Sequence, residues 1–147
     1  MRVLLINPAM NLAKMGRFGK LMEPMPPTGI AYIAGALEAH GVHVRAIDMF
    51  AEHLEIHEVV ERVVRYKPDV VGMSVLTPSA HVCEALTALV RERLPGVKFV
   101  WGAIHAEVFH QEICRDLGVD VVVHGDGEIT ITEIIDAFAR DETDLSG

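Results

Sequence analysis

Short apolar runs that alternate with helical patterns constrain the fold of this chain more than any other feature. In the clearest case the run at 70–73 (VVGM) leads directly into Ser74, and Pro78 then opens a long helical pattern. A near-continuous apolar run bounded by turn residues is typical of a strand that is buried on both faces. We therefore expect this strand to lie in mid-sheet, with Ser74 as its last side chain at the crevice where such sheets bind ligands.

Four further strands are expected at 3–6, 42–47, 97–101 and 120–123. The run at 42–47 alternates in character, as an edge strand does, whereas 3–6 is typical of a buried strand. Strands that alternate with helices form a parallel sheet with right-handed crossovers. We predict an α/β, flavodoxin-like (Rossmann-like) fold, a doubly wound five-stranded parallel sheet of order 2-1-3-4-5. The domain is expected over 1–139, followed by a polar tail at 140–147.

The helical patterns carry local signals of their own. Thr28 is expected to cap the first helix, and Gly41 to end it. Gly29 and Gly35 within this helix indicate close approach to the sheet or to a ligand. A single short helix is expected over 108–117.

Composition and charge exclude several classes of protein. Half of the residues are apolar, which excludes disorder for most of the chain. The formal charge of −8 argues against a nucleic-acid binder, because a phosphate backbone requires a basic surface. No apolar run reaches the roughly 18 residues of a membrane span, and the first run is too short for a signal-peptide core. We therefore expect a cytoplasmic protein without a membrane partner.

The two cysteines, Cys83 and Cys114, lie far apart in helical patterns. They form no CxxC or CxxxCxxC group, so neither a disulfide framework nor an iron–sulfur site is indicated. We expect two buried helix cysteines.

The candidate binding residues lie where the predicted strands end, because open parallel sheets bind ligands there. These ends are rich in glycine and small hydroxyls and poor in acid–base pairs. Such a composition favours a bulky ligand lying close to backbone rather than hydrolytic chemistry. The candidates are Asn7, Pro8, Ser74, Val75, Leu76, Thr77, Gly102, Ala103, His105, Gly125, Gly127 and Glu128.

The residues at these strand ends can be compared with those that known ligand sites of this fold require. A phosphoryl-accepting receiver domain requires acidic residues where this chain has Asn7 and Ser74. The GxGxxG motif of dinucleotide sites and the P-loop are both absent. FMN remains an alternative, since Ser74, Thr77 and Ser79 could hold a phosphate near a helix N-terminus. However, 7–11 lacks the hydroxyls and glycines of a phosphate loop.

Three further features have two interpretations each. A lone histidine such as His105 is more often a hydrogen-bonded loop residue than a metal ligand. Asp126 and Glu128 are expected to stabilise the start of the last helix rather than to act in catalysis. The methionine-rich segment 9–27 fits a surface loop and a lid over an irregular ligand equally well.

Five segments in order carry a family resemblance: NPA at 7–9, MPPTGIAYIAGALEAHGVHVRAID at 25–48, DVVGMSVLTPS at 69–79, WGAIHA at 101–106 and VVVHGDGE at 121–128. Together they resemble the N-terminal cobalamin-binding domain of cobalamin-dependent radical SAM enzymes. The group most similar contains the anaerobic magnesium-protoporphyrin monomethyl ester cyclase and related methyltransferases. The resemblance covers roughly residues 2–138.

The resemblance implies a base-off cobalamin whose corrin lies over the strand ends and whose nucleotide tail inserts alongside the sheet. Residues 74–76 match an SxL element, and its serine, Ser74, is expected to meet the benzimidazole tail. Gly102 and Ala103 stand where the family usually has Gly-Gly, close to the tail. The DxHxxG motif is absent after Asn7, so no histidine of that loop is expected on the cobalt. The cobalt ligands stay unassigned, and the methionine-rich loop would face the lower side of the corrin.

The resemblance also implies a partner. A radical SAM domain with a CxxxCxxC motif, S-adenosylmethionine and an iron–sulfur cluster is expected in cis or in trans. The chain would then be a piece of a longer protein or a stand-alone carrier, not catalytic alone, serving methyl transfer or cyclase-type chemistry. Two alternatives stay open: a flavodoxin-like carrier or sensor of another planar cofactor such as FMN, and an interaction module that binds nothing by itself.

Overall fold

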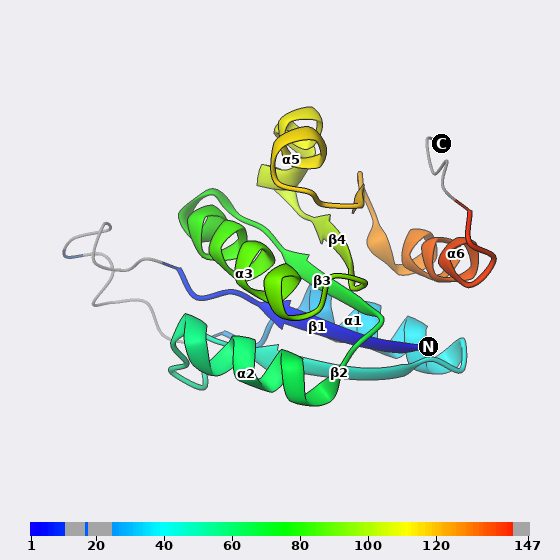
Figure 1. Cartoon of the computed structure of the whole chain (residues 1–147), viewed down its shortest axis with the longest axis horizontal. Helices are drawn as coiled ribbons and strands as arrows, with labels where there is room; N and C mark the ends of the chain where they lie inside the picture. The colour runs from blue at the N-terminus through cyan, green and yellow to red at the C-terminus, as the bar shows by residue number, and fades with distance from the viewer. Residues whose placement is uncertain (11–16, 18–24, 143–147) are drawn as a thin grey trace.

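β3 is the middle strand of a five-stranded parallel sheet of order β2-β1-β3-β4-β5, and β1 and β4 lie on either side of it (Figure 1). This computed structural model describes residues 1–10, 17 and 25–142. Its elements are β1 (Arg2–Asn7), α1 (Thr28–Ala39), β2 (His43–Asp48), α2 (Ile56–Tyr66), β3 (Val70–Ser74), the 3₁₀ turn η3 (Thr77–Ser79), α3 (Ala80–Arg93), β4 (Lys98–Gly102), α4 (Ile104–Val108), α5 (His110–Asp116), β5 (Val121–Val122) and α6 (Gly127–Ala139). The predicted fold class and strand order are confirmed.

Two hydrophobic cores sandwich the sheet. On one face Leu4, Val71 and Val75 pack with residues of α2 and α3. On the other face Val3, Leu5 and Val70 pack with α1 and α6 (Figure 1). Because side chains alternate along a strand, Gly72 and Ser74 share the face of Val70. That face leads to the site described below.

Several predicted boundaries are wrong. Thr28 is the first residue of α1, and Pro27 occupies the cap position without a side-chain hydrogen bond. The helix expected over 108–117 is instead two short helices, since Phe109 leaves the helical region between α4 and α5 (φ −109°, ψ 25°). The last strand is shortened to β5, which pairs only with β4.

The cysteine prediction is half right, because Cys83 is buried and Cys114 is exposed. Most of the methionine-rich segment, 11–16 and 18–24, lies outside the described residues, as does 143–147 of the polar tail. Within the described part, no helix combines the length and apolar character needed to cross a bilayer.

Candidate functional site

A cavity of about 260 Å³ opens at the carboxyl ends of β3 and β4, on the face of the sheet covered by α1 and α6. Its floor contains Leu5, Gly72 and Val100 of the three central strands. Ile30 and Ile33 of α1 form one wall, and the other wall comes from the segment 123–131. We call this space the glycine-floored cavity. An apolar slot of this kind with a few polar groups at one end is the usual form of a small-molecule site.

Gly72 leaves room in the floor of the cavity because it has no side chain. A Cβ atom at this position would lie 2.8 Å from Cδ2 of Leu5, closer than van der Waals contact allows. At the wall, a Cβ on Gly127 would lie 3.3 Å from Cδ1 of Ile33. The missing side chains therefore let the two helices and the sheet enclose a narrow space.

Ala103 has an unusual backbone at the cavity mouth, with φ 74° and ψ 172°. This region of backbone space is populated almost only by glycine and costs about 1–3 kcal/mol for other residues. Neighbouring hydrogen bonds hold the conformation: Val75 N–H donates to Gly102 O at 2.8 Å, and His105 N–H donates to Val75 O at 3.2 Å. The strained turn carries the chain from β4 into α4 across the end of the cavity.

Glu107 joins α4 to the loop between β5 and α6 at the mouth of the cavity. Its Oε1 accepts a hydrogen bond from Gly125 N–H at 3.1 Å and lies 3.7 Å from Nδ1 of His124. Gly125 has φ 68°, so the turn it forms favours glycine. The loop between β5 and α6 is thereby held over the cavity.

The predicted site residues fall into two groups. Six of them line the glycine-floored cavity: Ser74, Gly102, Ala103, Gly125, Gly127 and Glu128. The other six do not line it: Asn7, Pro8, Val75, Leu76, Thr77 and His105. Of these, Val75 is fully buried in the core on the opposite face of the sheet.

Leu76, Thr77 and His105 form a rim that follows the cavity residues Ser74 and Ala103 in the chain. Leu76 is 41% exposed at the end of β3, although large apolar side chains are usually covered. Oγ1 of Thr77 lies 3.2 Å from Nδ1 of His105, within hydrogen-bond distance, which links the ends of β3 and β4. His105 also stacks near Phe109, with ring centroids 4.7 Å apart.

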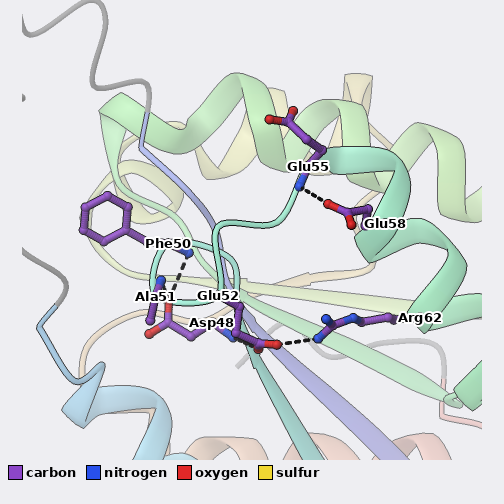
Figure 2. A network of polar contacts seen from close by, with 7 residues as sticks. All are labelled: Asp48, Phe50, Ala51, Glu52, Glu55, Glu58 and Arg62. Atoms are coloured by element: carbon purple, nitrogen blue, oxygen red, sulfur yellow. Dashed lines mark hydrogen bonds and ion pairs between the residues drawn. The ribbon is translucent and has the colours of Figure 1, made fainter.

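Asn7 has a structural role at the end of β1. Its Nδ2 donates to Oδ1 of Asp48 at 3.0 Å. The same Asp48 oxygen accepts hydrogen bonds from the N–H groups of Phe50 and Ala51, both at 3.1 Å (Figure 2). This network joins the carboxyl ends of β1 and β2.

The site carries little acid–base or metal-binding machinery. Within the described ranges, no group of three or more His, Cys, Asp and Glu side chains is placed to hold a metal ion. Burial raises the pKa of Cys83 to about 12, so this thiol stays protonated and unreactive. Asp126 occupies the cap position of α6 without a side-chain cap hydrogen bond, and Glu128 lies in the first turn.

Sequence reasoning missed most of the cavity's apolar lining. The sequence pattern assigns Ile30, Ile33 and Ile131 to the buried faces of helices. It does not show that they line a cavity, because periodicity does not tell which part of a buried face is left unfilled. Gly72 had a usable signal, since a glycine inside a strand often marks close approach. Gly29 lines the cavity, but a Cβ on Gly29 or on Gly35 would meet nothing within 4 Å, so neither glycine is needed for close approach of α1 to the sheet.

Comparison with known proteins decides the family. Residues 17–135 match the B12 binding domain family, which is most of the chain. The chain belongs to the B12-binding domain family. The predicted resemblance is confirmed.

Relatives of this B12-binding domain are longer proteins. It is 34% identical over 141 residues to the anaerobic magnesium-protoporphyrin IX monomethyl ester cyclase of Synechocystis sp., covering 94% of this chain and 28% of the relative. Its fold matches the radical S-adenosylmethionine methyltransferase TsrM from Kitasatospora setae, with a TM-score of 0.78 at 20% identity over 99% of this chain and 27% of that one. It also matches OxsB, solved with aqua-cobalamin and S-adenosylmethionine bound, with a TM-score of 0.78 at 16% identity over 98% of this chain and 19% of that one. The domain spans about a quarter of the length of the curated relatives it matches.

Proposed function

We propose that this domain binds cobalamin in its base-off form and presents the corrinoid to a radical SAM catalytic domain. The observation that carries the proposal is the glycine-floored cavity at the carboxyl ends of β3 and β4 in a member of the B12-binding family. A flat aromatic base suits a narrow apolar slot with a glycine floor and isoleucine walls. When bound, cobalamin would supply a cobalt centre able to carry a methyl group.

Each part of the site has a role in this proposal. Ser74, at the cavity end of β3, would donate a hydrogen bond to the benzimidazole tail. Gly72 and Gly102 would let the tail lie against the backbone, while Ile33 and Ile131 would exclude water from it. The segment 125–128 would flank the tail on the α6 side.

The rim would face the corrin. Asn7, Pro8, Leu76, Thr77 and His105 are proposed to lie beneath the ring rather than around the tail. Ala103, at the mouth of the cavity, would lie where the corrin ring joins the nucleotide tail. Val75 would contribute through its backbone alone, since its side chain is buried in the opposite core.

The catalytic chemistry is assigned to a partner. The curated relatives are about four times as long as this chain, and two of the solved structures with a similar fold, TsrM and OxsB, are radical S-adenosylmethionine enzymes. We propose that S-adenosylmethionine and an iron–sulfur cluster belong to a radical SAM domain in cis or in trans, acting in methyl transfer or cyclase-type chemistry. The domain over 1–139, the tail at 140–147 and a cytoplasmic location stay part of this proposal.

The test is titration of the 147-residue chain with hydroxocobalamin, followed by gel filtration and absorbance of the protein peak. Retained corrin with a base-off spectrum is the expected result. A colourless protein would contradict the proposal for the isolated domain. FMN added to the same sample then tests the alternative of a flavodoxin-like carrier.

Two variants localise the site. Ser74→Leu and Gly102→Val place bulk at the cavity end and are expected to abolish retention of corrin while the fold persists. Gly96→Val is the matched control, because Gly96 lies outside the cavity and a Cβ there meets nothing within 4 Å. Equal cobalamin affinity in all of these proteins would overturn the site assignment.

A further inference from the structure

A second hollow, of about 570 Å³, lies at the outer edge of the sheet between β2 and α2. Four arginines line it: Arg2 from the start of β1, Arg45 from β2, and Arg62 and Arg65 from α2. Tyr66, the last residue of α2, completes the wall. We call this space the arginine hollow. It shares no lining residue with the glycine-floored cavity.

The arginine hollow concentrates positive charge in a chain whose formal net charge is −8. Glu52 pairs with Arg62 at 2.5 Å (Figure 2). No carboxylate of the described residues lies within ion-pair distance of the guanidinium groups of Arg2, Arg45 and Arg65. One acidic side chain therefore faces four arginines.

Four arginines outside the hollow form ion pairs with carboxylates of described residues. The pairs are Arg91 with Asp120, Arg93 with Glu61, Arg115 with Asp116 and Arg140 with Glu142. Glu38 lines an adjoining hollow but forms no ion pair with the four arginines. Among the described arginines, Arg2, Arg45 and Arg65 lie together in one hollow without a carboxylate within ion-pair distance of their guanidinium groups.

Tyr66 holds two of the arginines in position. The Cζ atoms of Arg45 and Arg2 lie 4.8 and 5.8 Å from the centroid of its ring, within the range of a cation–π contact. The Tyr66 hydroxyl donates a hydrogen bond to His43 O at 3.3 Å, which fixes the ring against β2. The backbone N–H of Arg2 donates to Asp69 at 2.7 Å. Two like charges are therefore gathered over one ring before any ligand arrives.

We propose that the arginine hollow binds a small anion that carries more than one phosphate charge. Guanidinium groups present planar pairs of N–H donors that match phosphate oxygens in bidentate fashion. The hollow has the size of a small-molecule site, which favours a compact anion over an extended protein surface. Bound phosphate would balance the charge of Arg2, Arg45 and Arg65. This site is independent of cobalamin binding.

The test is calorimetric titration of the full chain with sodium pyrophosphate at constant ionic strength. Saturable one-to-one binding is expected. In the Arg45→Gln/Arg65→Gln double variant the affinity is expected to fall by about tenfold or more, because two charge-assisted contacts are lost. The Arg115→Gln/Arg140→Gln double variant is the matched control, since it removes the same two positive charges from exposed residues outside the hollow, and its affinity should equal that of the parent.

A second measurement does not depend on the variants. In the amide NMR spectrum of the parent chain, pyrophosphate is expected to shift signals of 43–47 and 62–66 and to leave 100–103 and 125–128 unchanged. Absence of binding, or equal binding in the double variant and the parent, would overturn the proposal. Binding of a polyglutamate peptide in place of pyrophosphate would also overturn it and assign the hollow to an acidic protein partner.

Discussion

Gly72 of β3 lies in register with Leu5 of β1, and a Cβ atom on Gly72 would come within 2.8 Å of Leu5 Cδ2. Both residues contribute to the floor of the glycine-floored cavity. The contact atom is the free end of a side chain, so Leu5 can yield by changing its position. The direction in which it yields is into the cavity, because the opposite side of the sheet is filled by a packed core.

Gly72→Ala is therefore expected to reduce the volume of the cavity and to lower the free energy of unfolding only modestly. We expect a loss of about 1 kcal/mol in the free energy of unfolding, as for modest overpacking, together with loss of hydroxocobalamin retention. Urea denaturation and gel filtration with cobalamin measure the two effects. Gly96→Ala is the control, since its Cβ would meet nothing within 4 Å. Full cobalamin affinity in Gly72→Ala would contradict the proposed place of the tail.

Ala103→Gly is expected to stabilise the protein. Ala103 has φ 74° and ψ 172°, a conformation that glycine adopts without steric cost. Relief of this strain outweighs the added freedom of the unfolded chain, and we expect a gain of about 1 kcal/mol in unfolding free energy. Ala31→Gly, at an exposed position inside α1, should instead destabilise by about 0.5–1 kcal/mol. A loss of stability in Ala103→Gly, measured by urea denaturation, would show that the backbone is not strained there.

Glu107→Ala is expected to loosen the loop between β5 and α6. The variant removes the acceptor of the Gly125 N–H bond, a contact of about 0.5–1.5 kcal/mol. If this loop covers the cobalamin tail, the dissociation constant should rise by about two- to tenfold. Glu107→Gln keeps an acceptor oxygen and should bind nearly as the parent does. Equal affinity for all three proteins in a cobalamin titration would show that the loop does not contribute to binding.

Asp120 is expected to make stability depend on pH in the acid range. Burial alone would raise its pKa, but hydrogen bonds from Phe99 N–H at 2.8 Å, Lys98 at 3.0 Å and Arg91 at 2.9 Å outweigh burial and hold the pKa below its usual range. A carboxyl whose pKa is lowered on folding contributes stability above its unfolded pKa of about 3.9, and this is lost as pH falls through the folded value. Asp120→Asn should therefore cost about 2 kcal/mol at neutral pH.

The gap between Asp120→Asn and the parent should begin to close below about pH 4, where the unfolded carboxyl takes up a proton, and should disappear once the pH is below the lowered folded pKa, where the folded carboxyl is neutral too. Urea denaturation at neutral and acid pH measures the gap. Asp116→Asn is the control, since Asp116 pairs with Arg115 on the surface, where an ion pair contributes little. A gap that stays constant with pH would show that the charge of Asp120 does not stabilise the fold.

The apolar runs and their alternation with helical patterns were enough to predict the architecture. The continuous run at 70–73 and the alternating run at 42–47 distinguish a central strand from an edge strand, and the strand order follows from these two assignments. Boundaries were less predictable. The break at Phe109 and the shortening of the last strand to β5 depend on how α4, α5 and β5 pack against the sheet.

The sequence also predicted the ends of the strands, including Ser74 and Gly102, as the place of the site, because a parallel sheet brings its carboxyl ends to one edge. Only the tertiary structure decided which of these residues line one cavity. Val75 and Ser74 are neighbours in the chain, yet Val75 packs in the core of α2 and α3 while Ser74 lines the cavity on the other face of the sheet. The walls of the cavity come from α1 and α6, nearly a hundred residues apart. The arginine hollow has the same origin, since Arg2, Arg45 and Arg65 meet only when β1, β2 and α2 are packed together. Periodicity is a local property that specifies elements and their buried faces, whereas a site depends on contacts between residues distant in sequence.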